Sequence, residues 1–208
     1  MTKRCLDVWM SAVGLLVLSP VLAVIAGGLL LSQGRPILFR QERPGLHGRP
    51  FRIAKFRTMR TPSPDEVAHQ TDDIRVTRIG RFLRTTSLDA LPALWNVLRG
   101  EMSVVGPRPL LMAYLDSYSD RQRSRHDVRP GVTGWAVVNG RHSLRFEERL
   151  ELDVWYVEHW SLALDLRIIR MTLQHLLTRA DVSETQDLGE IGFPLDPGDG
   201  PSSPGPGA

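Results

Sequence analysis

A long uncharged stretch separates the first 34 residues from the rest of the chain. No charged side chain lies between Asp7 and Arg35, and this run of 27 residues includes LLVLSPVLAVIAGGLLL. About 20 apolar residues are enough to cross the hydrocarbon core of a bilayer as a helix. The pattern therefore predicts a membrane-attached helical segment over residues 1–34, with membrane lipid as its partner.

Three interpretations of this segment stay open. Residues 24–26 resemble a signal-peptide cleavage site, but the apolar run continues past them. A straight spanning helix fits the length, yet basic residues flank both ends, and such residues favour the cytoplasmic side. Pro20 lacks the N–H that its position in a helix would use, so a helix should bend there. A break at Ser19-Pro20 predicts a re-entrant hairpin that enters and leaves the bilayer by one face.

Residues 36–60 have the alternating pattern of a short β-hairpin. Residues 37–39 are apolar, residues 43–50 are rich in proline and glycine, and residues 51–56 alternate apolar with mostly basic side chains. Alternation with a period of two is typical of a half-buried strand. We therefore expect two short strands around a turn.

Residues 88–99 (LDALPALWNVLR) have the spacing of an amphipathic helix. Ser87 or Asp89 is expected to cap its start, where the helix dipole favours an ionised carboxylate. A plain capping aspartate is the competing interpretation of Asp89. The face expected to be buried consists of Leu91, Leu94, Trp95 and Leu98.

Residues 145–179 also have a helical pattern, with arginines bordering an apolar face that contains Leu164, Ile168, Met171 and Leu176. Such a helix suits the headgroup layer of a membrane, or the domain core, or both. Residues 181–208 are acidic and rich in proline and glycine, which predicts disorder. The predicted fold class is α+β: a re-entrant membrane helix-break-helix (1–34), a mostly helical cytosolic domain with a short hairpin (35–180), and a disordered tail (181–208).

The distribution of charge points to an anionic partner. The net charge is +3, but residues 181–208 hold six acidic and no basic side chains, which leaves +9 on residues 1–180. Such a domain suits nucleic acid, lipid headgroups or a phosphorylated small molecule. We expect no nucleic acid, because the arginines fall in turns and not along a groove-reading helix. The single Cys5 excludes a disulfide framework.

Three arginines lie at the edges of stiff turns rich in proline and glycine. Arg108 is held between Pro107 and Pro109, and two further turns contain Arg129 and Arg141. Proline restricts the backbone and so presents a neighbouring guanidinium rigidly, which suits a phosphate. Together with the basic strand before them, these turns predict an oxyanion pocket.

These segments, taken together and in this order, resemble one family, the monotopic bacterial sugar transferases, which are polyprenyl-phosphate phosphoglycosyl transferases. The similarity runs from Lys3 to about Ala180 and is of the minimal catalytic-domain type. Any one of the matching segments alone would be weak, but so many in order are specific. They are Lys3-Arg4 with Asp7, Ser19-Pro20, residues 41–45, 55–59, 87–89, 96–103, 105–109, 129–136 and 139–141, and Glu151-Leu152-Asp153 with Tyr156.

The resemblance implies a reaction and a place in the cell. A nucleotide-diphosphate sugar, expected to be a UDP-sugar, gives its phosphosugar to a polyprenol phosphate such as undecaprenyl phosphate, which initiates glycan or exopolysaccharide assembly. The expected location is the cytoplasmic face of the bacterial inner membrane. Magnesium is the implied cofactor, and a homodimer is left open. Which sugar is transferred does not follow from the sequence.

The resemblance also assigns roles to individual residues. Asp89 is the expected nucleophile and forms a covalent phosphosugar intermediate, and it is also a candidate magnesium ligand. Arg108 is the expected catalytic arginine at the phosphate. The residues expected to bind the substrate, or to order the groups that do, are Lys55, Arg57, Arg129, Arg141 and Asp165, with Glu101 as a further candidate.

Two departures from the family pattern stand out. Ala90 occupies the position where the family has a glutamate implicated in magnesium binding, and alanine offers no oxygen to a hard cation. Val137 replaces a usual glutamine, for which we have no account. Ala90 keeps a second hypothesis open, in which the chain is a catalytically silent homologue that binds the same ligands.

Overall fold

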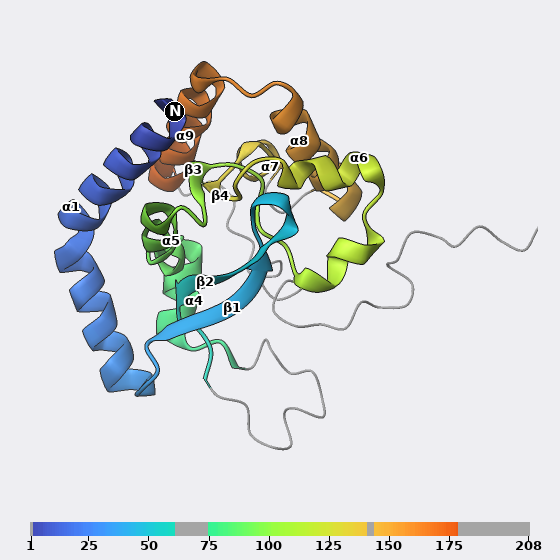
Figure 1. Cartoon of the computed structure of the whole chain (residues 1–208). Coiled ribbons are helices and arrows are strands. Elements are labelled where there is room, and N and C mark those ends of the chain that lie inside the picture. The colour runs from blue at the N-terminus through green and yellow to red at the C-terminus, as the bar shows by residue number, and fades with distance from the viewer. Residues whose placement is uncertain (1, 61–74, 141–143, 179–208) are drawn as a thin grey trace, which may run out of the picture.

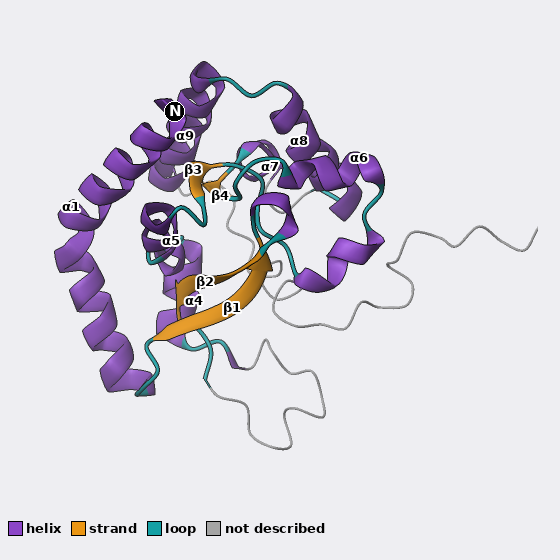
Figure 2. Ribbon diagram, in the orientation of Figure 1, coloured by secondary structure: helices purple, strands orange, loops and turns teal. Residues whose placement is uncertain are grey.

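The computed structural model describes residues 2–60, 75–140 and 144–178, which form the α+β fold expected from the sequence (Figures 1 and 2). The predicted tail (181–208) and Arg141 lie outside the described residues. The helices are α1 (Thr2–Gln33), α4 (Arg78–Thr85), α5 (Ala93–Arg99), α6 (Asp120–Arg123), α7 (Trp135–Gly140), α8 (Phe146–Glu158) and α9 (Leu162–Thr178), and the strands are β1 (Leu38–Pro44), β2 (Pro50–Phe56), β3 (Ser103–Val105) and β4 (Gly131–Thr133).

Helix α1 confirms the predicted N-terminal apolar helix. Within the described ranges it is the one helix long and apolar enough to cross a membrane. It bends near its middle, where Pro20 lies, but its backbone stays helical throughout (Figure 1). Ser19 Oγ donates to the Leu16 carbonyl at 2.7 Å, which is the acceptor that Pro20 cannot use. The hydroxyl therefore replaces the missing hydrogen bond, and the expected break is a bend.

The first two turns of α1 are fastened to the domain by three charged side chains. Asp7 is buried and accepts hydrogen bonds from Ser103 Oγ and from the Val104 N–H at 3.0 Å. Lys3 pairs with Asp165 on α9. Arg4 donates to two carbonyls in the last turn of α5, where a positive charge also complements the helix dipole.

The hairpin of β1 and β2 confirms the predicted strands and turn. The strands pair antiparallel from Leu38 opposite Phe56 to Pro44 opposite Pro50. Strand β1 reaches further than expected, because residues 43 and 44 continue the ladder before a single 3-10 turn over Leu46–Gly48. Proline at the strand end is tolerated because no ladder hydrogen bond from its nitrogen is required there.

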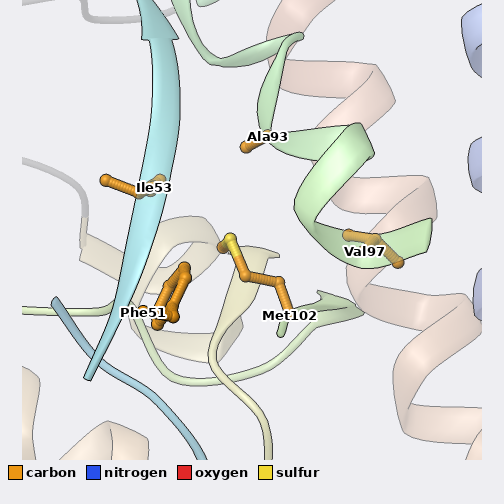
Figure 3. Close-up of a cluster of buried hydrophobic side chains, with 5 residues drawn as sticks. All are labelled: Phe51, Ile53, Ala93, Val97 and Met102. Atoms are coloured by element: carbon orange, nitrogen blue, oxygen red, sulfur yellow. The ribbon is translucent and has the colours of Figure 1, made fainter. Parts of the chain in front are cut away.

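The core beside the hairpin is formed by β2 and α5 (Figure 3). Phe51 and Ile53 from β2 pack with Ala93, Val97 and Met102, and all five are at most 8% exposed. Burial of this face fixes the distance between the two elements, since apolar area removed from water is the main stabilising term.

The prediction of which face of α5 is buried is wrong in part. Trp95 is 57% exposed, whereas Ala93 and Val97 are buried against the hairpin. A second side of α5 faces α1, where Leu94 lies close enough to touch a Cβ added at Gly14. A helix between two neighbours buries two faces, which a single-stripe reading of the sequence cannot reveal.

The turns around Arg108 and Arg129 form a small parallel pair, β3 and β4, that the sequence analysis did not anticipate. A Cβ at Gly131 would lie 2.1 Å from the Gly106 nitrogen, and one at Gly134 would lie 2.2 Å from the Gly106 oxygen. The glycines therefore allow two backbone segments to touch. Residues 145–178 confirm the predicted helical structure, which consists of two helices, α8 and α9.

A buried polar cluster joins α8 to the segment that follows β3. Arg125 is 1% exposed and donates to Asp153 Oδ2 at 2.5 Å and to Tyr118 Oη at 3.1 Å. Burial alone would lower the pKa of Arg125. The charges of Asp153 and Tyr118 and the hydrogen bonds to them outweigh burial and raise this pKa above its usual value. His126 packs on the Tyr118 ring and is 8% exposed.

We expect His126 to make stability depend on pH. Burial, together with the charge of Arg125, lowers the pKa of His126 from 6.5 to about 4. Between these two pH values His126 binds a proton in the unfolded chain but not in the folded chain. The stability that neutral His126 provides is therefore fully present above about pH 6.5 and is lost as pH falls towards 4. One group contributes at most about 1.4 kcal/mol per pH unit.

The measurement is the Tm of the detergent-solubilised protein between about pH 7 and about pH 4.5, compared with His126→Gln. The variant should show a shallower fall. His159→Gln, at an exposed position, is the matched control and should keep the wild-type slope. Parallel curves for the wild type and His126→Gln would contradict the prediction.

Candidate active site

A cavity of about 310 Å³ opens beside β2, close to the point where α1 ends. Among the described residues, a single acidic side chain, Asp89, lines it together with seven basic ones. An anionic group would therefore enter a strongly positive environment. The basic side chains are Arg43, Lys55, Arg57, Arg60, Arg75, Arg84 and Arg108.

Asp89 lies on a 3-10 turn, Leu88–Ala90, between α4 and α5. It is 6% exposed, and its Oδ2 lies 3.9 Å from Lys55 Nζ. Ser87, two residues earlier, has a left-handed backbone (φ 56°), a conformation that costs a non-glycine residue about 1–3 kcal/mol. The strained turn directs the carboxylate into the cavity and towards a cation.

The expected helix start at Ser87 or Asp89 is wrong. Helix α5 begins at Ala93 after Pro92, and Ser87 makes no side-chain cap. Pro92 has no N–H to donate to the Leu88 carbonyl, and the Leu91 N–H donates to that carbonyl instead, as in a 3-10 turn. Asp89 therefore lies on a 3-10 turn before α5, with Lys55 as a cationic neighbour.

Asn96 sets the alignment of α5 against β2 and was not singled out in the sequence. Its Oδ1 accepts from the Ala54 N–H at 3.0 Å, and its Nδ2 donates to the Arg52 carbonyl at 2.8 Å. The amide thus completes the free edge of β2 next to Lys55. This pairing fixes the turn that contains Asp89 relative to the strand that contains Lys55.

Arg108 lines the cavity from the segment after β3. Its carbonyl accepts from Arg125 Nη2 at 2.6 Å, and the next carbonyl, of Pro109, accepts from Arg43 Nη1 at 3.3 Å. Arg43 and Arg125 are both buried. The buried guanidiniums of Arg125 and Arg43 therefore fix the backbone at Arg108 and Pro109.

The structure brings four of the predicted site residues to one cavity: Lys55, Arg57, Asp89 and Arg108. Ala90 lines the same cavity. Arg57 also makes a structural contact, because its Nη2 donates to the Gln33 and Gly34 carbonyls at the end of α1. It thereby ties the membrane helix to the cavity wall.

Three other predicted residues lie elsewhere and have structural partners. Arg129 Nε donates to the Gly100 carbonyl at 2.8 Å, which closes the end of α5. Asp165 is buried and accepts from Lys3, Tyr156 and Trp160. Glu101 accepts from Asn96. None of the three lines the cavity.

Arg84 is a cavity residue to which the sequence analysis assigned no role. It lies in the last turn of α4, and its Nε donates to Thr58 Oγ1 at 2.9 Å. The available signal was the run of basic residues at 75, 78, 81 and 84, of which Arg75 and Arg84 line the cavity.

The described residues do not fit a resident magnesium ion. They contain no group of three or more His, Cys, Asp or Glu side chains able to hold a metal. The cavity offers one carboxylate beside seven cationic side chains, and Ala90 adds no oxygen. Magnesium prefers oxygen ligands, usually one or two carboxylates together with substrate phosphates.

Comparison with known proteins identifies the family of the chain. The profile of the bacterial sugar transferase family matches residues 1–179. The uncharacterized sugar transferase EpsL of Bacillus subtilis (strain 168) is 44% identical over 183 residues, which cover 88% of this chain and 91% of that protein. The chain belongs to the bacterial sugar transferase family.

Two further relatives are longer proteins. The UDP-glucose:undecaprenyl-phosphate glucose-1-phosphate transferase of Escherichia coli (strain K12) is 42% identical over 181 residues, covering 82% of this chain and 39% of that protein. The UDP-galactose-lipid carrier transferase of Erwinia amylovora is 39% identical over 194 residues, covering 85% and 40%. The chain thus spans about two fifths of the length of these two relatives.

Proposed function

We propose that this protein transfers a phosphosugar from a UDP-sugar to a polyprenol phosphate, with Asp89 as the covalent nucleophile. The observation that carries the proposal is a buried carboxylate facing Lys55 in a cavity of seven basic side chains, beside the end of an apolar helix. The names of the relatives support the two substrates, a UDP-sugar donor and an undecaprenyl phosphate acceptor.

The proposed reaction has two steps. First, a carboxylate oxygen of Asp89 attacks the sugar-bearing phosphorus, the bond from that phosphorus to the bridging oxygen breaks, and the nucleoside monophosphate leaves with that oxygen. An oxygen of the acceptor phosphate then attacks the same phosphorus and releases the Asp89 carboxylate. Lys55 and Arg108 offset the negative charge of the transferring group in both steps.

We propose further that α1 is re-entrant and that the domain lies at the cytoplasmic face. A helix of 32 residues is about 48 Å long, yet both ends of α1 touch the same domain. Lys3, Arg4 and Asp7 bind at one end, and Leu29 is buried at the other. Between these ends the outer side of α1 is exposed, with Leu16 and Val24 both 75% accessible, while Gly14, Leu22 and Ile25 face the domain. A helix that lies along the domain, with an apolar outer side and basic residues at both ends, suits entry and exit by one face.

The function is tested by release of nucleoside monophosphate across several UDP-sugars, with the protein in nanodiscs that contain polyprenol phosphate. The expected result is release together with a lipid-linked sugar product. The silent-homologue hypothesis, favoured by Ala90, predicts product only after Ala90→Glu. No lipid-linked product from either chain would contradict both.

Ala90→Glu is also expected to change the response to magnesium. Ala90 lines the cavity next to Asp89, so a glutamate there adds an oxygen ligand for a hard cation. The concentration of magnesium that gives half-maximal activity should fall by about tenfold or more. Ala90→Gln is the matched control, similar in shape but neutral, and should stay near the wild-type value. Equal responses of the Glu and Gln variants would contradict the prediction.

A further inference from the structure

Two buried N–H donors of the cavity have no hydrogen-bond partner within the described part of the chain. They are Arg57 Nε and Arg84 Nη2, and both side chains line the cavity that contains Asp89. Buried polar groups are almost always paired, and leaving a charged donor unpaired is costly. The two atoms therefore indicate a place for a ligand that accepts hydrogen bonds and is negatively charged.

Both guanidiniums are held in position by other contacts. Arg57 Nη2 is engaged by the carbonyls of Gln33 and Gly34, and Arg84 Nε by Thr58 Oγ1. These bonds fix the side chains without using the unpaired nitrogens. A ligand would therefore meet donors that are already oriented, which lowers the entropic cost of binding.

The surroundings of this arginine pair are apolar on the side of the membrane helix. Phe56 and Leu83, the residues just before Arg57 and Arg84, are buried in one cluster with Leu29 of α1. Leu22, Ile25 and Ala26 of α1 pack partly buried against the same cluster. The pair thus lies where the second half of the apolar helix meets the cavity, directly beside the end of α1.

We infer that Arg57 and Arg84 bind the phosphate monoester of the polyprenol acceptor, while Lys55 and Arg108 serve the donor. This inference rests on the proposed function. Of the two substrates, only the acceptor has a hydrocarbon chain that must stay in the bilayer while its phosphate reaches the cavity. A phosphate bound by donors at the end of an apolar helix meets that requirement, and Arg forms strong paired hydrogen bonds with phosphate.

In the second step the bound acceptor phosphate supplies the attacking oxygen. The new bond joins that oxygen to the phosphorus held on Asp89, and the bond between the phosphorus and the Asp89 oxygen breaks. The carboxylate is regenerated and the product is a polyprenyl diphosphosugar. The arginine pair forms no covalent bond in this step and only positions and neutralises the acceptor.

Arg84 is the better residue for the test. Gln33 Oε1 is also buried without a partner, and it belongs to the residue whose carbonyl Arg57 already binds, so Arg57 has an acceptor within the chain at hand. The variants are Arg84→Gln and Arg84→Lys, with Arg78→Gln as matched control. Arg78 is exposed, begins the same helix and does not line the cavity.

Two measurements separate the two steps. Intact mass after incubation with the UDP-sugar alone reports the adduct on Asp89, and product formation at varied polyprenol phosphate gives kcat/KM for the acceptor. Arg84→Gln should form the adduct as the wild type does and lose about 10- to 100-fold in acceptor kcat/KM. Arg84→Lys, which keeps the charge, should lie between the two, and Arg78→Gln should match the wild type.

Adduct formation by Arg84→Gln also shows that the variant is folded, and Arg84→Lys serves if it is not. The inference is overturned if the Arg84 variants lose the adduct in proportion to turnover, or if acceptor kcat/KM does not change. It is also overturned if the defect appears only in nanodiscs with phosphatidylglycerol and not in zwitterionic ones, since the pair would then bind ordinary lipid headgroups. Failure of the wild type to form any adduct would instead contradict the proposed function.

Discussion

We expect Asp89→Asn to abolish the covalent phosphosugar adduct and to lower turnover by at least about a thousandfold. The amide has the same shape as the carboxylate but is neutral and a poor nucleophile, so neither step of the proposed reaction can proceed through it. The side chain is buried and faces Lys55, and an isosteric change keeps its packing. Intact mass with a UDP-sugar measures the adduct, and nucleoside monophosphate release measures turnover.

Asp116→Asn is the matched control for this experiment. Asp116 also lies in a 3-10 turn, Met112–Ser117, but it is exposed and does not line the cavity. Its adduct yield and turnover should equal those of the wild type. An adduct of wild-type yield on the Asp89→Asn protein would reject Asp89 as the nucleophile, and a large loss of Tm would show that the carboxylate is needed for folding.

The second large effect is expected from the buried pair of Arg125 and Asp153. Their side chains are 1% and 4% exposed and lie 2.5 Å apart. Arg125→Met removes the guanidinium that offsets the buried Asp153 carboxylate, so it should lower the free energy of unfolding by about 3–5 kcal/mol. For a domain of this size, that corresponds to a fall in Tm of roughly 6–20 °C.

Two further variants test the physical reason. Arg125→Met combined with Asp153→Leu removes both charges and should recover most of the loss, because two apolar groups replace the pair. Arg121→Met breaks the exposed pairs of Arg121 with Glu151 and Glu158 and should cost far less, because water already screens these charges. A double variant less stable than Arg125→Met, or a loss at Arg121 equal to that at Arg125, would contradict the argument.

The pair at Arg125 also links stability to the site. Arg125 donates to the carbonyl of Arg108, and Arg43 donates to that of Pro109. A loss of Arg125 therefore frees the backbone beneath a cavity arginine, and turnover should fall in proportion to the disorder of that segment. The cavity thus depends on Arg125, which does not line it.

The sequence by itself determined the elements with a strong one-dimensional signal. The uncharged run predicted α1, because only an apolar helix of that length satisfies its backbone in a membrane. The alternation at residues 51–56 predicted β2 and placed Lys55 on the same side of the strand as Ile53. The motif around Asp89 marked the acidic residue that the structure places in the cavity.

Tertiary contacts decided the rest. Contacts with two neighbouring elements determined which sides of α5 are buried. A hydrogen bond to the Gly100 carbonyl placed Arg129 at the end of that helix, and the close approach of Gly106 requires glycine at position 131. The 3-10 turn at Asp89, the alignment by Asn96 and the unpaired nitrogens of Arg57 and Arg84 also depend on segments far apart in the chain. Local pattern specifies which residues can bind phosphate, because charge and spacing are properties of the sequence. Which of them do so depends on whether their donors already have acceptors within the protein, and only the folded chain provides those acceptors.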